Sequence, residues 1–269
     1  MTTASFPASN MTALSPPEAI PVMLDYDREA AYYDVTRGGD ARASAAAEAI
    51  ESLLPPAADR IADLGCGTGI VTVRMRRPGR SVLGVDRSAG MAARALARLP
   101  GRIVLGDVTR LPLASGSADA VTMVWLLHLL SRAGSAAALG SAGRALRPGG
   151  VLITTVGKND AAYQGTDDAS AILRPARDRS GRGGQSDDLD RVLEIGGQYG
   201  LSLAGRAAFP GLGQGRSPRQ WRARLLDGEI SWAGPACVES LAAALAALPG
   251  QDRPRPDPVY QLVALRKSR

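Results

Sequence analysis

The sequence predicts an α/β fold in which a mostly parallel sheet carries helices on both faces. In segment 61–71, a short apolar run suited to a buried strand breaks into alternating glycines and then resumes with helical spacing. In addition, three successive apolar runs each end in an acid, at Asp63, Asp86 and Asp107. The carboxyl ends of parallel strands meet at one edge of the sheet, where open α/β folds bind ligands. A ligand site is therefore expected at that edge.

Strand-like and helix-like segments alternate along the chain, as this fold requires. Strands are predicted at 60–63, 81–86, 102–107, 120–125, 151–156, 201–209 and 259–265. Helices are predicted at 43–54, 69–76, 89–99, 136–146, 190–199, 218–226 and 240–248. Pro78-Gly79 is expected to end the second of these helices, and Ser88 is expected to cap the third.

The chain is predicted to consist of a tail and one domain. Residues 1–21 are rich in Ser, Thr, Ala and Pro, which is typical of a mobile tail. The domain over 22–269 is divided into a helical leader, a ligand-binding core, and substrate-side elements with the last strands, at 22–55, 56–157 and 158–269. Segment 157–190 is polar and Gly-rich without a clear period, so a loop or lid with partial helix is expected there.

Composition limits the possible partners. The 269 residues carry a net charge of +6 with a pI of about 9.8, so nucleic acid has to be weighed. Arginines are spread along the chain and often lie beside acids, which favours a solvated surface and makes nucleic acid an unexpected partner. Only two cysteines are present, Cys66 and Cys237, which suits a reducing cytoplasm. No secretion signal and no apolar run long enough to span a membrane is found.

The glycine segment has a distinctive form, Asp-x-Gly-x-Gly-x-Gly, running from Asp63 to Gly69. Glycines there allow positive φ and let a ligand approach the backbone closely. A dinucleotide loop has G-x-G-x-x-G spacing instead. An acid two residues before the first glycine suits a ligand with a cationic amino-acid head and repels a pyrophosphate. This segment resembles the first motif of class I S-adenosylmethionine-dependent methyltransferases.

The resemblance covers about 26–265 and is strongest up to Val156. Asp86 ends the second strand, where an acid accepts hydrogen bonds from both ribose hydroxyls, as it also does in dinucleotide enzymes. Gly106-Asp107-Val108 resembles the motif whose carboxylate takes the adenine amino group. The resemblance implies a Rossmann-like seven-stranded sheet with an antiparallel last strand, a helical cap insertion, and S-adenosylmethionine as the cofactor.

The expected cofactor-binding residues lie at the sheet edge or in the leader that folds over it. In the leader, the resemblance places Tyr33 and Arg37 at the methionine end, although these leader side chains also suit a purely anchoring role. Met91 is expected against adenine. The full set is Tyr33, Arg37, Asp63, Gly65, Cys66, Gly67, Thr68, Gly69, Asp86, Arg87, Met91, Gly106, Asp107, Val108 and Val124.

The acceptor site is expected after the fourth strand, in Trp125-Leu126-Leu127-His128. His128 is the only histidine, which excludes a multi-histidine metal site, and no metal is predicted. Its ring takes a proton near neutral pH, so it is the candidate general base, or else it shapes the pocket. Asp34, Tyr32 and Asp167 are weaker candidates for the base. The predicted acceptor-binding residues are Tyr26, Tyr32, Trp125, His128 and Trp221.

The predicted reaction is methyl transfer to an oxygen or nitrogen atom of a small natural-product acceptor. Transfer from a sulfonium is in-line displacement, so alignment supplies much of the rate. The leader and the Trp-Leu-Leu-His segment resemble antibiotic-pathway enzymes of secondary metabolism. Carbon methylation, RNA methylation, a nicotinamide-dependent oxidoreductase and a non-catalytic cofactor-binding protein remain alternatives, and a homodimer is left open. The Asp/Asn-Pro-Pro-Tyr element of nucleic-acid amino methyltransferases is absent from the sequence.

Overall fold

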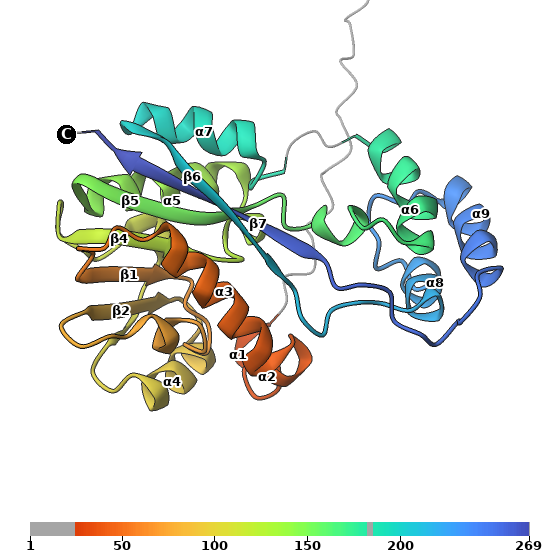
Figure 1. Ribbon diagram of the computed structural model, residues 1–269, viewed down its shortest axis with the longest axis horizontal. Coiled ribbons are helices and arrows are strands. Elements are labelled where there is room, and N and C mark those ends of the chain that lie inside the picture. Colours follow the sequence, from red (N-terminus) through yellow and green to blue (C-terminus); the bar gives the residue numbers. More distant parts are fainter. Residues whose placement is uncertain (1–24, 182–184, 269) are drawn as a thin grey trace, which may run out of the picture.

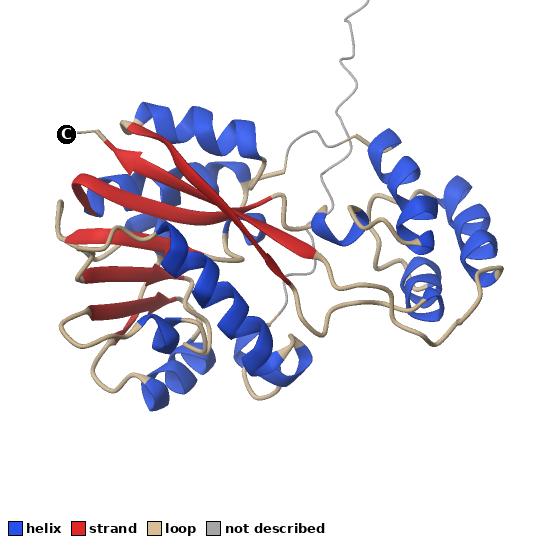
Figure 2. Ribbon diagram, viewed as in Figure 1, coloured by secondary structure: helices blue, strands red, loops and turns tan. Residues whose placement is uncertain are grey.

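The computed structural model describes residues 25–181 and 185–268, and its centre is one seven-stranded sheet (Figures 1 and 2). The strand order is β3-β2-β1-β4-β5-β7-β6. Pairs among β1 to β5 are parallel, whereas β7 runs antiparallel to both β5 and β6. The strands are β1 (Arg60–Leu64), β2 (Ser81–Asp86), β3 (Ile103–Leu105), β4 (Ala118–Met123), β5 (Leu146–Val156), β6 (Leu201–Pro210) and β7 (Val259–Lys267). The predicted fold class, including the antiparallel last strand, is confirmed.

Helices cover both faces of the sheet. Helix α3 (Gly39–Leu53) packs on one face, and α5 (Arg132–Ala145) and α7 (Leu189–Gln198) pack on the other. Successive side chains of β5 point to opposite faces of the sheet, so this strand contributes to the hydrophobic cluster on each face. Ile153 packs in the cluster on the α3 side, and Leu152 packs in the cluster on the α5 side. Helix α4 (Ala89–Arg98) packs against β2 and β3, and Ser88 caps it by accepting the Met91 N–H, as predicted.

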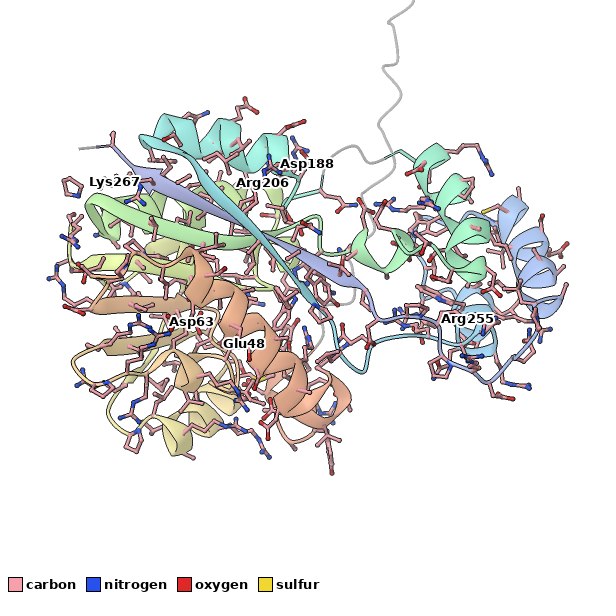
Figure 3. The ribbon with its side chains drawn as sticks, viewed as in Figure 1. Glu48, Asp63, Asp188, Arg206, Arg255 and Lys267 are labelled. Atoms are coloured by element: carbon pink, nitrogen blue, oxygen red, sulfur yellow. The ribbon has the colours of Figure 1, made fainter. Side chains whose placement is uncertain are left out.

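A second helical group forms a cap beyond the carboxyl end of β5 and the amino end of β7 (Figure 1). It consists of η4 (Ala161–Tyr163), α6 (Asp168–Arg179), α8 (Pro218–Leu226) and α9 (Pro235–Ala246). These elements share a separate apolar cluster in which the Tyr163 and Trp221 rings lie 5.4 Å apart. Figure 3 shows the separation of the two parts, with Asp63 inside the sheet region and Arg255 in the cap region.

Several element boundaries differ from the prediction for local reasons. The predicted helix 69–76 is only a 3₁₀ turn, η1 (Thr72–Met75), because Gly69 has a φ of +75° and belongs to the preceding loop. Helix α6 is the helical part of the segment 157–190, for which a loop or lid with partial helix is predicted; its polar composition and internal Pro175 hide its bounds in the sequence. Strand β4 ends at Met123, so Trp125 lies beyond it.

The leader consists of two short helices, α1 (Tyr26–Glu29) and α2 (Tyr33–Thr36). It precedes α3, which begins four residues earlier than predicted. The predicted tail 1–21 lies outside the described residues. Within the described residues, every helix falls short of the length and apolar character that a membrane crossing requires.

Candidate functional site

The glycine loop follows β1 and opens toward solvent at its centre. Gly65, Gly67 and Gly69 have φ values of +67°, +55° and +75°, which side chains rarely adopt. A Cβ on Gly65 would lie 2.7 Å from Leu126 Cδ1, so that glycine is required for packing. A Cβ on Gly67 would meet nothing within 4 Å. The backbone at Gly67 is therefore accessible to a ligand.

Asp86 lies at the end of β2 and fixes the shape of this loop. Its Oδ2 accepts the Gly67 N–H at 2.8 Å, and its Oδ1 accepts the Ser88 N–H at 2.9 Å. Each carboxylate oxygen has a second lone pair available. Asp86 thus holds the glycine loop in shape, and its oxygens can still accept hydrogen bonds from a ligand beside Gly67.

Asp63 lies beneath the loop and is 4% exposed. Register places it beside Thr122 of β4, whose Oγ1 donates to Oδ1 at 2.7 Å, while Thr72 Oγ1 donates to Oδ2 at 2.6 Å. Burial raises the pKa of Asp63 to about 6, and the charge of Asp86 adds to the rise. Both carboxylate oxygens already accept a hydrogen bond from a threonine. Asp63 is therefore expected to affect a ligand in the loop through its charge and not through direct contact. The sequence did not indicate the two threonines.

Asp107 follows β3 and is exposed. Its Oδ1 accepts both the N–H and the hydroxyl of Thr109, each at 2.8 Å, and these hydrogen bonds lower the pKa of the carboxyl below its ordinary value. Its other oxygen makes no hydrogen bond within the described part of the chain. The third predicted acid is therefore ionised and open to a ligand.

The remaining predicted cofactor-binding side chains form the walls of this region. Met91, Val108 and Val124 are buried, at 2%, 7% and 9% exposure, so their side chains define shape and offer little open surface. Cys66 is buried against Gly84, and this burial raises the pKa of its thiol above the ordinary range. Arg87 is exposed next to Asp86, and Gly106 packs against Pro112.

The leader is hydrogen-bonded to the glycine loop. Asp34 accepts Thr68 Oγ1 at 2.6 Å and Arg98 Nη2 at 2.7 Å, and the same guanidinium donates to the Thr68 carbonyl at 2.7 Å. Earlier in the leader, Asp27 accepts Ser88 Oγ at 2.6 Å. The leader is thus hydrogen-bonded both to the glycine loop, at Thr68, and to the start of α4, at Ser88. Both segments carry predicted cofactor-binding residues.

Replacing Asp34 with asparagine is expected to loosen the leader, because the half-buried pair with Arg98 loses its charge. A charged hydrogen bond contributes about 1.5 kcal/mol or more, so amide hydrogen exchange over residues 26–37 should accelerate by roughly tenfold. Mass spectrometry of the unliganded protein measures this. Asp40→Asn is the matched control, since the Asp40 side chain is 85% exposed in its single ion pair. Equal exchange in both variants would contradict the assigned role.

Trp125 occupies the carboxyl end of β4 with a φ of +55°, a strained value for a bulky residue. Its N–H donates to Thr155 Oγ1 at 2.9 Å. The guanidinium of Arg42 lies 3.5 Å from the centre of its ring, although the Arg42 side chain is only 5% exposed. Phe209 and Tyr260 meet the indole edge-on. This packing holds the strained conformation in place.

His128 lies in η3 (Leu127–Leu129), and its Nδ1 is buried without a hydrogen-bond partner within the described residues. Burial, followed by the charges of Lys158, Arg42 and Arg37, holds its pKa well below the ordinary value. The imidazole is therefore neutral at neutral pH. An imidazolium formed by proton abstraction would face several cations, which disfavours the base role unless a bound anion offsets them.

The structure brings together some of the predicted aromatic residues. Tyr26 and Tyr33 have ring centres 6.2 Å apart, and the Arg37 guanidinium lies 5.7 Å from the Tyr33 ring. Burial raises the pKa of Tyr26 to about 12, so it remains protonated. Tyr32, in contrast, is 71% exposed and makes no ring contact within the described residues. Trp221 is buried in the cap.

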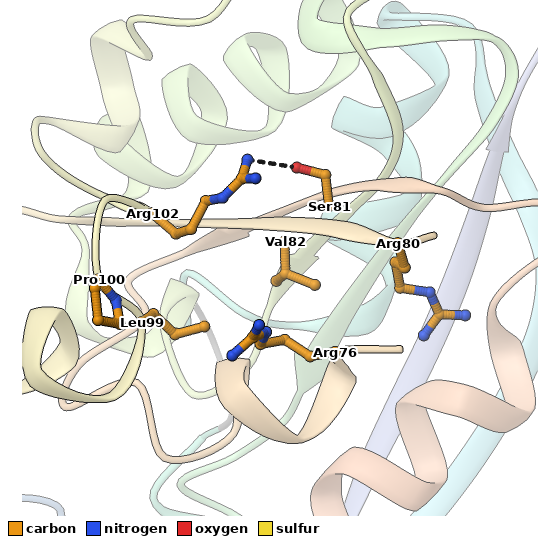
Figure 4. A pocket seen from close by; sticks show the side chains of 7 residues that line it. All are labelled: Arg76, Arg80, Ser81, Val82, Leu99, Pro100 and Arg102. Carbon is orange, nitrogen blue, oxygen red and sulfur yellow. Dashed lines mark hydrogen bonds between the residues drawn. The ribbon is translucent and has the colours of Figure 1, made fainter. Parts of the chain in front are cut away.

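Two surface pockets lie at opposite ends of the sheet strands. A cleft of about 450 Å³ lies between the strand ends and the cap, where Val156, Gln214, Arg216 and Trp221 help to line it. A smaller hollow of about 120 Å³ lies at the amino ends of β2 and β3, where Arg102 Nη1 donates to Ser81 Oγ at 3.0 Å (Figure 4). Only the first adjoins the carboxyl edge, so the smaller hollow is separate from the site.

Residues 62–154 match the methyltransferase domain family. Over 106 residues the chain is 41% identical to an uncharacterized methyltransferase of Mycobacterium tuberculosis, covering 39% of this chain and 42% of that protein. Over 96 residues it is 42% identical to a demethylmenaquinone methyltransferase of Beutenbergia cavernae, covering 35% and 39%. The chain therefore spans less than half the length of these curated relatives.

Solved structures are similar over nearly the whole fold. A methyltransferase-like protein from Bacillus halodurans has a TM-score of 0.55 at 15% identity, with 83% of this chain and 98% of that chain covered. The [4+2]-cyclase SpnF has a TM-score of 0.57 at 20% identity, with 92% and 95% covered. These likenesses show a shared fold. The family match supports S-adenosylmethionine as the cofactor, in agreement with the sequence prediction.

Proposed function

We propose that the chain, whose residues 62–154 match a methyltransferase domain, transfers a methyl group from S-adenosylmethionine to an oxygen or nitrogen atom of a small acceptor. The observation that carries this proposal is the arrangement at the carboxyl edge. Asp63, Asp86 and Asp107 end three adjacent strands around a backbone that is open at Gly67. An ordered set of acids at neighbouring strand ends suits a nucleoside with a cationic amino-acid part.

The residues present fit this cofactor. The open space at Gly67 admits a ligand against the backbone, and Asp86 beside it has lone pairs for the ribose hydroxyls. The unpaired oxygen of Asp107 suits the adenine amino group. Tyr33 and Arg37 in the leader are assigned to the methionine end. When bound, the cofactor supplies a methyl group already activated by its sulfonium.

The other residues then position the acceptor and exclude water. The leader, through Asp34 and Thr68, covers the loop on the cofactor side. Trp125 and His128 follow β4 on the acceptor side. The cleft beneath the cap, lined in part by Val156 and Trp221, lies at the end of the neighbouring strand β5. We assign His128 to hydrogen bonding as a neutral imidazole, because the surrounding cations oppose its protonation. An acceptor that arrives deprotonated suits such a site.

A small acceptor is proposed in preference to nucleic acid because residues of the cap, among them Ala161, Ser170 and Trp221, line one side of the cleft. A role in natural-product or antibiotic biosynthesis rests on the resemblance of the leader and the Trp125 to His128 segment. The similarity to demethylmenaquinone methyltransferase makes demethylmenaquinone one acceptor to test, with carbon methylation as the alternative reaction.

Calorimetric titration tests the cofactor first. S-adenosylmethionine and S-adenosylhomocysteine are expected to bind with micromolar dissociation constants, about −8 kcal/mol, whereas NAD and NADP should give no heat above dilution. Binding of a nicotinamide cofactor alone would overturn the proposal. Binding of S-adenosylmethionine without turnover of any acceptor in a broad screen would instead favour a protein that binds the cofactor and transfers nothing.

A further inference from the structure

Four cations that affect one another electrostatically gather at the carboxyl edge of the sheet. Arg37 comes from the leader, Arg42 from α3, Lys158 from the loop after β5, and Arg216 from the loop before α8. None of the four forms an ion pair within the described residues. Some poorly exposed guanidiniums elsewhere are paired, as Arg177 is with Asp160 at 2.8 Å, whereas others, such as Arg191, donate to a backbone carbonyl instead. The four cations differ from these because they act on one another: the charges of Arg42, Arg37 and Arg216 all lower the pKa of Lys158.

Aromatic rings contact the three arginines without neutralising them. Arg42 lies 3.5 Å from the Trp125 ring centre and 5.8 Å from that of Tyr260, and Arg216 lies 4.9 Å from that of Trp221. Arg42 Nη1 also donates to the Arg37 carbonyl at 2.7 Å, while its buried Nε has no partner among the described residues. Arg191 and Arg224 have an unpartnered Nε too, so it is the grouping of the four cations that indicates a ligand with acceptor atoms.

The nearest acid does not offset this charge. Asp187 is 1% exposed, and its Oδ2 accepts the backbone N–H of Lys158 at 2.8 Å, while its Oδ1 has no partner within the described residues. The Lys158 ammonium itself has only one weak neighbour, Asn159 Oδ1 at 3.4 Å. Burial and the charges of Arg42, Arg37 and Arg216 lower the pKa of Lys158 to about 8, against the opposing effect of Asp187.

The cofactor would increase the positive charge. S-adenosylmethionine carries a sulfonium and an ammonium against one carboxylate, so it brings net positive charge to the same edge. Its carboxylate suits one guanidinium, and Arg37 beside Tyr33 is on the cofactor side. Arg42, Lys158 and Arg216 then remain without a counter-charge, and their mutual repulsion favours binding of an anion.

We propose that the acceptor carries an oxyanion, a carboxylate or a phosphate, which Arg42, Lys158 and Arg216 bind beside His128. This inference rests on the proposed function and names the substrate class of the same site. It also removes the electrostatic obstacle to proton uptake by His128. With an anion bound among the cations, His128 can accept a hydrogen bond or a proton without facing uncompensated positive charge.

The test uses the full chain saturated with S-adenosylhomocysteine. Benzoate, its neutral analogue benzamide and inorganic phosphate are titrated at constant ionic strength, with tryptophan fluorescence or calorimetry as the readout. Benzoate or phosphate is expected to bind at least tenfold more tightly than benzamide, in the millimolar range typical of fragments. Which of the two anions binds more tightly distinguishes a carboxylate acceptor from a phosphorylated one.

Two variants and a control identify the binding residues. Lys158→Gln and Arg216→Gln are each expected to weaken binding of the preferred anion about tenfold with unchanged S-adenosylhomocysteine affinity. Arg94→Gln, on the exposed side of α4, removes the same charge and should change nothing. Equal binding of benzoate and benzamide, or equal effects of all three variants, would overturn the inference.

The role of Lys158 also predicts a pH dependence. Anion affinity of the wild-type protein should fall as pH rises from 7 to 9, because a lysine with a pKa near 8 loses its charge there. Lys158→Arg should keep its affinity over this range. Anion binding that is abolished by S-adenosylhomocysteine would assign the cluster to the cofactor carboxylate instead, and would overturn this inference while leaving the proposed function intact.

Discussion

Asp86→Ala is expected to weaken binding of S-adenosylhomocysteine by about 100-fold or more. The carboxylate is proposed to accept two ribose hydroxyls, and hydrogen bonds to a charged group contribute about 1.5–3 kcal/mol each. In the unliganded protein the same carboxylate accepts the N–H groups of Gly67 and Ser88. The variant therefore loses ligand contacts and also the fixed shape of the glycine loop.

Calorimetry with S-adenosylhomocysteine measures this effect, and Asp86→Asn separates its two parts. Asparagine keeps one acceptor oxygen, so its loss should be smaller than that of alanine. Asp252→Ala is the control, because Asp252 is an exposed acid in the cap that pairs with Arg219 at 2.6 Å. Unchanged affinity in Asp86→Ala would remove the basis of the cofactor site.

The sequence predicts an edge of the sheet lined by acids from local signals, and the structure brings these acids to one edge. A strand that ends in an acid and a loop with alternating glycines are short patterns, and parallel pairing brings the acids together without further information. The edge formed by Asp63, Asp86 and Asp107 is an example. Conversely, the helix predicted at 69–76 is wrong because the φ of Gly69 is set by packing against Ala95 of α4, which no local pattern contains.

The acceptor side could not be predicted in the same way. The arginines were interpreted as a solvated surface because many lie beside acids in sequence. Arg42, Lys158 and Arg216 are far apart in the chain and come together only when α3, the loop after β5 and the loop before α8 reach the same edge of the sheet. The hydrogen bonds of Asp34 to Thr68 and Arg98 are long-range in the same sense. Charge clusters of this kind depend on topology.

Asp63→Asn is expected to stabilise the unliganded protein at pH 8 while weakening its affinity for S-adenosylmethionine. Burial raises the folded-state pKa of this acid from 3.8 to about 6. Between these values the folded state binds a proton that the unfolded state has released, so the free energy of unfolding falls as pH rises. Above pH 6 the ionised carboxylate costs on the order of 3 kcal/mol, which a neutral amide avoids.

Thermal unfolding at several pH values measures this cost. The melting temperature of Asp63→Asn should exceed that of the wild type by several degrees at pH 8, and the difference should shrink as pH falls through 6 toward 4. Asp119→Asn is the opposing control. Asp119 is also buried, but it accepts the Arg60 N–H at 2.8 Å, and such bonds lower its pKa, so its loss should destabilise the protein at pH 8.

A buried acid that destabilises its own fold is retained where its charge serves binding. Asp63 lies directly beneath the loop that is proposed to hold the cationic head of the cofactor, and its ionised form strengthens the negative field there. Cofactor binding should in turn favour the ionised carboxylate. Its affinity in the wild type is therefore expected to fall as pH drops below 6, whereas the affinity of Asp63→Asn should be low and nearly independent of pH. If Asp63→Asn were stabilised but bound S-adenosylmethionine as tightly as the wild type, the charge would have no role in binding.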